Sequence, residues 1–258
     1  MAIAKVRWLA FAEGSLCAAS VFFWTQAAWE DQLGRNIVAR ATTQALSDED
    51  RVLSIMHTVH RIMDDRRALF LPPHSILRDR LIRSVDAHLI DANQMCGSSA
   101  RVLARLLQLD GRDVRLGIMC GSSGGWGVHT VVLTPVNGRW IVLDAFYDLA
   151  FRDEQGRLLG PEEIRDQWDR LADDLPPGYK QDYDYRGMKF SDWKGIPVEW
   201  LGSWTSDVSL GTFVLNQWRV FALVSSTALV VTLVADFRAA GARRRSSASE
   251  SPVDRRSN

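Results

Sequence analysis

The chain has 258 residues, and its 31 lysines and arginines balance its 31 aspartates and glutamates, so its formal net charge is zero. Nucleic-acid binding usually shows as an excess of basic residues, and this balance gives it no support. Five histidines and three cysteines occur without a pair at zinc-ligand spacing, so the sequence predicts neither a metal nor another cofactor.

The first apolar segment, residues 8–28, is predicted to be a membrane helix within an anchor spanning residues 1–31. It is long enough for a bilayer core, which requires about 20 residues. A signal peptide is the second interpretation, because Lys5 and Arg7 precede the segment and the small residues 18–20 permit cleavage.

The pattern Ser47-Asp48-Glu49-Asp50 is typical of a capping box and predicts that a helix begins there. His57 and His60 lie three apart on this helix, which is a spacing that a ligand pair can have. The sequence offers them no third ligand, so a partly exposed helix face is the favoured interpretation. Apolar residues at helical spacing predict that the opposite face is core: Val52, Ile55, Met56, Val59, Ile62 and Met63.

Cys96 opens a second amphipathic helix, which is expected to end at Asp110-Gly111. A helix N-terminus stabilises a thiolate through its unpaired N–H groups and its dipole. The same N–H groups can form half of an oxyanion hole. Gln94 is a weak candidate for the second oxyanion donor, whereas Asn93 is better interpreted as a helix cap. The apolar stripe of this helix consists of Ala100, Leu103, Leu106 and Leu107.

Three strands are predicted after this helix, at residues 114–120, 128–136 and 139–143. Asn137-Gly138 is a strong signal for a tight hairpin between the second and third strands. His129 lies in the second strand, and Asp144 ends the third. Asp148 is a weaker alternative to Asp144.

Cys96, His129 and Asp144 together have the residue types and the order of a cysteine nucleophile, its general base and the carboxylate that orients the base. Each residue taken alone has an ordinary structural explanation: a buried thiol, a core histidine and a turn-forming aspartate. In combination, on these elements, they favour acyl transfer through a thiolate.

Cys120 is a rival nucleophile, because residues 95–99 recur identically at 119–123. The glycine-rich segment that follows Cys120 is a poor helix former, so this thiol lacks the helix N-terminus that favours Cys96. The glycine-rich loop allows a close approach to substrate, with Trp126 as a candidate wall, or is an ordinary surface loop. Cys120 is also the one candidate partner for a redox pair with Cys96.

The residues from Cys96 to Asp144 resemble the transglutaminase-like superfamily over positions 80 to 160, about a third of the chain. The quoted motifs are Cys96 with its helix, Arg115-Leu116-Gly117, His129-Thr130-Val131-Val132 and Gly138-Arg139-Trp140-Ile141-Val142-Leu143-Asp144, with the aromatic segment 145–151 similar to bacterial members. The resemblance implies an α+β, papain-like core, in which the nucleophile helix packs on an antiparallel sheet. It implies Cys96 as nucleophile, His129 as base and Asp144 as orienter. Because the superfamily includes cross-linking enzymes, proteases, amidases and members without known activity, the resemblance indicates a mechanism better than a substrate.

Pro161 is expected to begin a helix that continues to Leu175. Residues 179–204 show little periodicity and many aromatic side chains, which is typical of a loop. Such a loop can line a substrate groove, cover the core or rest on a membrane surface.

Residues 220–235 form an uncharged run between Arg219 and Asp236, which predicts a C-terminal transmembrane helix at residues 211–237. A basic, disordered tail is expected at residues 238–258. Basic residues precede the first span and follow the second, so the positive-inside rule predicts that both termini are cytoplasmic. The domain between the spans, residues 32–210, is then extracytoplasmic, on the outer face of the inner membrane in a bacterium.

Three hypotheses for the function follow. The first is a membrane-anchored cysteine acyltransferase or hydrolase that acts on amide bonds of an envelope protein or peptide. The second is an inactive relative that serves as a binding or assembly module beside envelope polysaccharide machinery. The third is a redox-responsive membrane protein that uses Cys96 and Cys120. The expected partners are a protein or peptide substrate, possible envelope assembly proteins and, through the two spans, membrane lipid.

Overall fold

The protein is an α+β chain that divides into two compact units, Met1–Ala27 with Trp218–Asn258, and Ala28–Gln217. A computed structural model describes residues 2–67, 96–121, 126–171, 175–193 and 217–249. Each unit is considered by itself.

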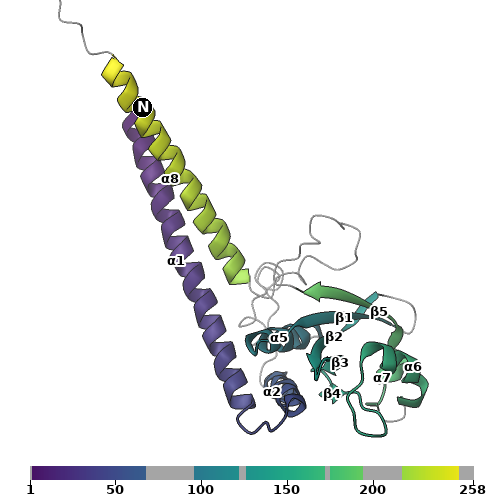
Figure 1. The fold of residues 1–258 in the computed structure, drawn as a ribbon. Coiled ribbons are helices and arrows are strands. Elements are labelled where there is room, and N and C mark those ends of the chain that lie inside the picture. The colour runs from purple at the N-terminus through teal and green to yellow at the C-terminus, as the bar shows by residue number, and fades with distance from the viewer. Residues whose placement is uncertain (1, 68–95, 122–125, 172–174, 194–216, 250–258) are drawn as a thin grey trace, which may run out of the picture. The chain divides into compact units, whose positions relative to one another are not determined.

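The first unit pairs the N-terminal part of α1 (Ala2–Ala41) with α8 (Gln217–Ser249), and the two helices run in opposite directions (Figure 1). Ser20 Oγ lies 3.1 Å from Ser225 Oγ, and Trp24 Nε1 donates to Ser226 Oγ at 3.2 Å. Small hydroxyl residues are typical of helix contacts in a membrane, because they allow close approach and satisfy one another's hydrogen bonds. Both helices are long and apolar enough to cross a membrane.

Both terminal helices extend beyond their expected limits. α1 continues to Ala41, past the end of the anchor expected at residue 31. α8 continues to Ser249, which corrects the expectation of a disordered tail from residue 238. Alanine and arginine are strong helix formers, and they dominate the sequence just after residue 237. Residues 211–216 and 250–258 lie outside the described part of the chain.

The second unit is built on a five-stranded antiparallel sheet with the order β4-β3-β2-β1-β5. Three expected strands are confirmed as β1 (Val114–Gly121), β2 (Trp126–Val136) and β3 (Arg139–Asp144), while β4 (Leu149–Ala150) is a short addition at the edge. The expected hairpin is also confirmed: Asn137 and Gly138 both have positive φ, at 50° and 79°. Positive φ at both central positions produces the tight turn whose twist matches the strands.

The strand β5 (Tyr183–Trp193) corrects the expectation of a loop after residue 179. It pairs with β1 over its whole length, with a register irregularity between Ile118 and Cys120. Its sequence begins Tyr-Asp-Tyr-Arg-Gly-Met-Lys-Phe and lacks a regular apolar alternation. The strand is therefore stabilised by its pairing with β1 and not by a pattern that its own sequence shows.

Two helices cover one face of the sheet, and the predicted start of the first and the predicted end of the second are confirmed. α2 (Asp48–Arg67) is capped by Ser47, whose Oγ accepts the Asp50 N–H at 3.0 Å. α5 (Cys96–Leu109) ends at Gly111 (φ 85°), and the Arg112 N–H donates to the Leu107 carbonyl at 3.0 Å, which closes a Schellman motif.

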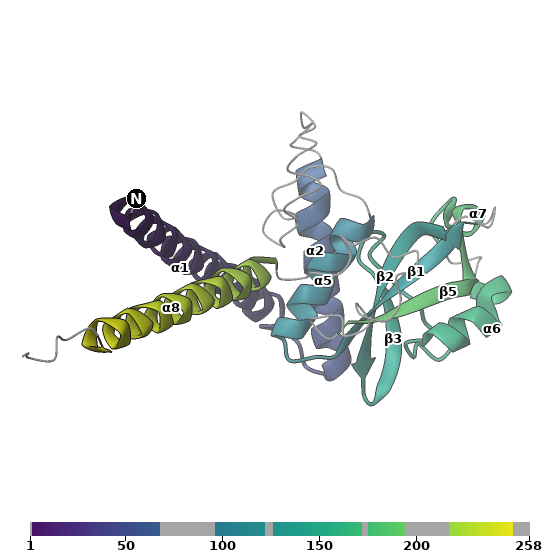
Figure 2. The ribbon, with the colours of Figure 1, turned by 90° about the horizontal axis from the view of Figure 1, so that it is seen from above.

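The core has two layers, one on each face of the sheet (Figure 2). α2, α5 and the sheet bury the first layer, which includes the whole predicted apolar stripe of α5. α6 (Pro161–Leu171) and the single turn α7 (Tyr179–Asp182) lie on the second layer, where Trp168, Tyr179 and Tyr185 are buried.

The C-terminal part of α1 belongs to this second unit and packs on α5. Arg105 of α5 forms an ion pair with Asp31 of α1, and both side chains are about nine-tenths buried. A Cβ at Gly34 would lie 2.3 Å from the Leu109 side chain, so the absence of a side chain at Gly34 permits this close packing. The helix that carries Cys96 is therefore held from both the α1 and the α2 sides.

Candidate active site

The candidate nucleophile Cys96 is the first described residue of α5, and its side chain is half-buried. Four residues later the helix enters the core at Ala100, and Leu103 and Leu107 are completely buried. The position of the thiol is therefore set by a rigid, tightly packed helix. Its place at the N-terminus gives it the backbone N–H groups that stabilise an anion.

The hairpin between β2 and β3 brings His129 and Asp144 together. Val132 pairs with Leu143, so this register places Asp144 opposite Val131, and His129 is the next residue along β2 on the same face. His129 Nε2 lies 2.6 Å from Asp144 Oδ2, and both side chains are inaccessible to solvent. A carboxylate accepts hydrogen bonds, so Nε2 carries the proton and the lone pair of the neutral ring is on Nδ1.

The Asp144 carboxylate is surrounded by donors. Its Oδ1 accepts the backbone N–H groups of Phe146 at 3.1 Å and Tyr147 at 3.3 Å. Its Oδ2 accepts the Tyr179 hydroxyl at 2.7 Å as well as His129. Because four donors converge on it, the side chain is held in one orientation.

The second nitrogen of His129 is directed away from this carboxylate. Nδ1 is buried and has no hydrogen-bond partner of ordinary geometry among the described residues. The Cys96 side chain is nevertheless close enough to act on the pKa of the ring through hydrogen bonding and charge. Catalytic hydrogen bonds are often long before substrate binds, and an approach of this kind suits a thiol and its base at rest.

The pKa of His129 reflects these neighbours. Burial favours the neutral ring and lowers the pKa, but hydrogen bonding and charge from Asp144 and Cys96 outweigh burial and raise it to about 9. His129 is therefore an imidazolium at neutral pH. A positive ring beside a sulfur is the partner that a thiolate nucleophile requires.

An aromatic cluster encloses the imidazole, and the sequence did not identify it. Tyr183 stacks on His129 at 4.3 Å between ring centroids, while Phe146, Tyr147 and Tyr179 meet the ring edge-to-face. The hydroxyls of Tyr147 and Tyr183 lie 3.1 Å apart. The available signal was the spacing of Tyr183 and Tyr185, which places two tyrosines on one face of a strand.

Several other residues predicted for the site lie elsewhere or outside the description. Asp148, the alternative to Asp144, is bonded to His57 at 2.6 Å instead. His60 Nδ1 donates to the Ala145 carbonyl at 3.2 Å, so neither histidine of α2 is a spare ligand. Gln94 lies in the segment 68–95, outside the described residues. The side chains of Cys120 and Trp126 are also outside the description, although the backbones of these two residues pair with each other across β1 and β2.

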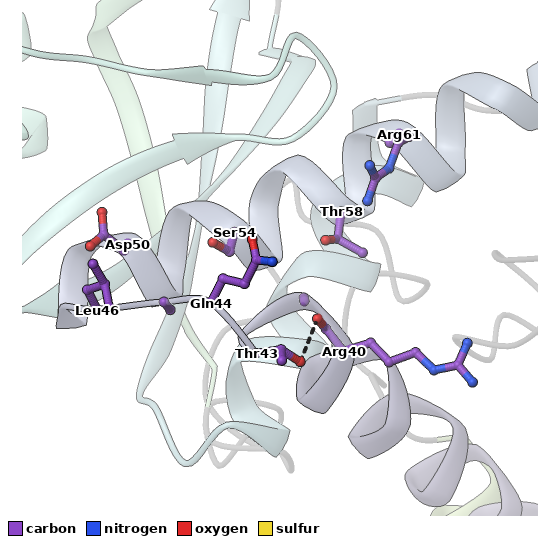
Figure 3. Close-up of a pocket in the computed structure, with 10 residues that line it drawn as sticks. Arg40, Thr43, Gln44, Leu46, Asp50, Ser54, Thr58 and Arg61 are labelled. Carbon is purple, nitrogen blue, oxygen red and sulfur yellow. Dashed lines mark hydrogen bonds between the residues drawn. The ribbon is translucent and has the colours of Figure 1, made fainter.

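Elsewhere, the described residues form no group of three or more histidine, cysteine or acidic side chains that could hold a metal ion. They do line a hollow of about 640 Å³ where α1 meets α2 (Figure 3). Its walls include Arg40, Gln44, Asp50 and Arg61, and they hold hydroxyl residues such as Ser54 but no cysteine or histidine that could form a nucleophile and base pair. The groups suited to chemistry are therefore those around His129.

Comparison of the chain with models of known protein families, with curated protein sequences and with solved structures finds no match.

Proposed function

We propose that this protein is a membrane-anchored cysteine enzyme that transfers or hydrolyses acyl groups at amide bonds of a protein or peptide. The observation that carries the proposal is the order Cys96, His129, Asp144 in space: a thiol at the N-terminus of α5 beside His129, whose Nε2 lies 2.6 Å from Asp144. A papain-like core of the transglutaminase-like superfamily is part of the same proposal. The motifs quoted above and the packing of α5 on an antiparallel sheet support it.

In the first half of the proposed reaction, the Cys96 thiolate attacks the carbonyl carbon of the amide. The carbonyl electron pair moves to oxygen, and N–H groups at the start of α5 stabilise the resulting oxyanion. The imidazolium of His129 then donates its Nδ1 proton to the leaving nitrogen as the C–N bond breaks. The products are a free amine and an acyl thioester on Cys96.

In the second half, neutral His129 removes a proton from water or from an acceptor amine, which attacks the thioester carbonyl. The thiolate of Cys96 leaves, and the imidazolium forms again. Asp144, which four donors hold in one orientation, orients the ring and stabilises the imidazolium in both halves.

The test is labelling by an electrophilic probe that mimics a peptide amide and captures a thiolate. We expect the wild-type protein to be labelled rapidly at pH 7, and His129→Ala to be labelled about a hundredfold more slowly, since general acid–base assistance is lost. Mass spectrometry gives the rate, and circular dichroism shows whether the variant is folded. Equal rates in the two folded proteins would contradict the proposal, and a wild-type protein inert to the probe would favour a non-catalytic binding module.

We also propose that α1 and α8 both cross the inner membrane of a bacterium, with both termini cytoplasmic and the sheet domain extracytoplasmic. The length and apolar composition of the two helices support this, as do Arg243, Arg244 and Arg245 beyond the second span.

Reporter fusions test this topology. Reporters fused at residue 1 and after residue 258 should read cytoplasmic, and one inserted near Arg152, in the exposed turn at residues 154–156, should read extracytoplasmic. Recovery of a soluble protein that lacks the first 30 or so residues would instead show that residues 8–28 are a cleaved signal peptide.

A further inference from the structure

Tyr179 is a buried hydroxyl residue at the centre of the site, and the proposed reaction does not use it. Its ring is completely inaccessible to solvent, and its hydroxyl donates to Asp144 Oδ2 at 2.7 Å. Because this proton is already committed to Asp144, the neighbouring Tyr185 hydroxyl, 3.1 Å away, is the donor in the next bond. The result is a directional chain from Tyr185 through Tyr179 to Asp144 and His129.

The backbone around Tyr179 is arranged to deliver this hydroxyl. Gly178 adopts a left-handed conformation (φ 85°) that side chains rarely tolerate, and it reverses the chain into the single turn α7. The Tyr179 N–H donates to the Pro176 carbonyl at 3.0 Å, and the Asp182 N–H to the Gly178 carbonyl at 3.1 Å. The turn is therefore closed by its own hydrogen bonds, with the Tyr179 ring packed against Trp168 and Phe151.

We infer that Tyr179 is a positioning residue, whose O–H fixes Asp144 Oδ2 in line with His129 Nε2 and so keeps Nδ1 of the ring turned toward Cys96. The inference deepens the proposed function and rests on it. Two donors share Oδ2, so the Tyr179 bond prevents the carboxylate from rotating and takes up part of its negative charge.

The phenol is suited to this task over the working pH range. Burial, with the charges of Tyr185 and Asp144, raises the pKa of Tyr179 well above its ordinary value, so it remains a donor. Among the described residues, the other titratable groups that face His129 are Cys96, Asp144, Tyr147 and Tyr183. The Tyr179 hydroxyl contacts the Asp144 carboxylate, whereas the hydroxyls of Tyr147 and Tyr183 lie beside each other.

The experiment compares Tyr179→Phe with Tyr185→Phe in the full-length protein. Both variants remove one buried hydroxyl and keep the ring, but only the first removes a donor to Asp144. In Tyr179→Phe we expect labelling by the amide-mimicking probe to slow about tenfold at pH 7, the size of a lost hydrogen bond to a charged group. We also expect the His129 pKa, followed by NMR of labelled histidine, to move to higher pH, because Asp144 then concentrates more charge on the imidazolium.

Tyr185→Phe should lower the thermal stability of the protein as much as Tyr179→Phe does. It should have a smaller effect than Tyr179→Phe on the labelling rate and on the pKa of His129. Replacing Tyr179 by a difluorotyrosine, a stronger donor, should move the His129 pKa in the opposite direction, and it serves if Tyr179→Phe does not fold. A His129 pKa that is the same in wild type, Tyr179→Phe and the fluorinated protein would overturn the inference. A wild-type protein inert to the probe whose His129 pKa still responds to Tyr179 would refute the proposed function alone.

Discussion

Replacing Cys96 by serine is expected to abolish labelling by the amide-mimicking probe, with a loss of about 10⁴-fold or more, as for nucleophiles that act as one unit with their base. A serine hydroxyl is a far weaker acid than a thiol and stays protonated at neutral pH, so the N-terminus of α5 no longer carries an anionic nucleophile. Mass spectrometry of the digested protein locates the label and measures its rate.

Cys120→Ser is the matched control, since it removes the second cysteine of the same five-residue motif. Cys120 lies in β1 rather than at a helix N-terminus, so most of the labelling should be retained. Equal loss in the two variants would show that the nucleophile has been assigned wrongly. If wild-type activity instead depends on added reductant and Cys120→Ser removes that dependence, the redox pair of Cys96 with Cys120 would gain support.

Replacing Asp144 by asparagine is expected to impair both folding and catalysis. Two backbone N–H groups occupy Oδ1, so the amide NH₂ of asparagine must take the place of Oδ2, where it meets the proton of His129 Nε2 unless the ring changes its tautomer and the Tyr179 hydroxyl rotates. The charge that balances the buried imidazolium is also removed. We expect a loss of about 3 kcal/mol in the free energy of unfolding and about a hundredfold in labelling rate. Chemical denaturation and probe kinetics measure the two.

The pH dependence distinguishes this effect from a simple packing defect. The pKa of His129 is raised from 6.5 to about 9 in the folded protein, so the protonated ring stabilises the folded state. This contribution to the free energy of unfolding is complete below pH 6.5 and is lost as the pH rises through about 9. Its size is about 3 kcal/mol. The stability difference between wild type and Asp144→Asn should therefore narrow across this range.

Asp148→Asn is the control for the pH experiment, because it makes the same substitution at a carboxylate that bonds the exposed His57. It should change stability little at any pH. A constant difference between wild type and Asp144→Asn from pH 6 to pH 10 would show that Asp144 does not set the charge of His129.

The sequence was sufficient to predict most of the elements that hold the candidate triad. Local signals were strong there: the Ser47 cap, the α5 stripe with its Gly111 terminus, and the Asn137-Gly138 turn. The turn does more than connect β2 to β3, since a two-residue loop sets the register that places His129 diagonal to Asp144.

The elements that the sequence did not reveal depend on contacts between distant segments. β5 has no alternation of its own, and its pairing with β1 is a tertiary effect that propensity does not report. Tyr179 and Tyr183 reach His129 only because β5 returns to the sheet beside β1. Because this aromatic-rich segment has no periodicity, its sequence did not predict that these tyrosines surround the imidazole.

The ion pair between Asp31 and Arg105 limits where the chain can be cut to obtain the domain without its membrane helices. The boundary suggested by the sequence, residue 32, would separate Asp31 from Arg105 and leave a guanidinium about nine-tenths buried without its carboxylate. Removing one member of a buried pair costs about 3–5 kcal/mol, a large part of the stability of an ordinary domain. A water-soluble fragment for spectroscopy should therefore begin at Ala28, where the compact unit begins, so that the last turns of α1 remain against the helix that carries the nucleophile.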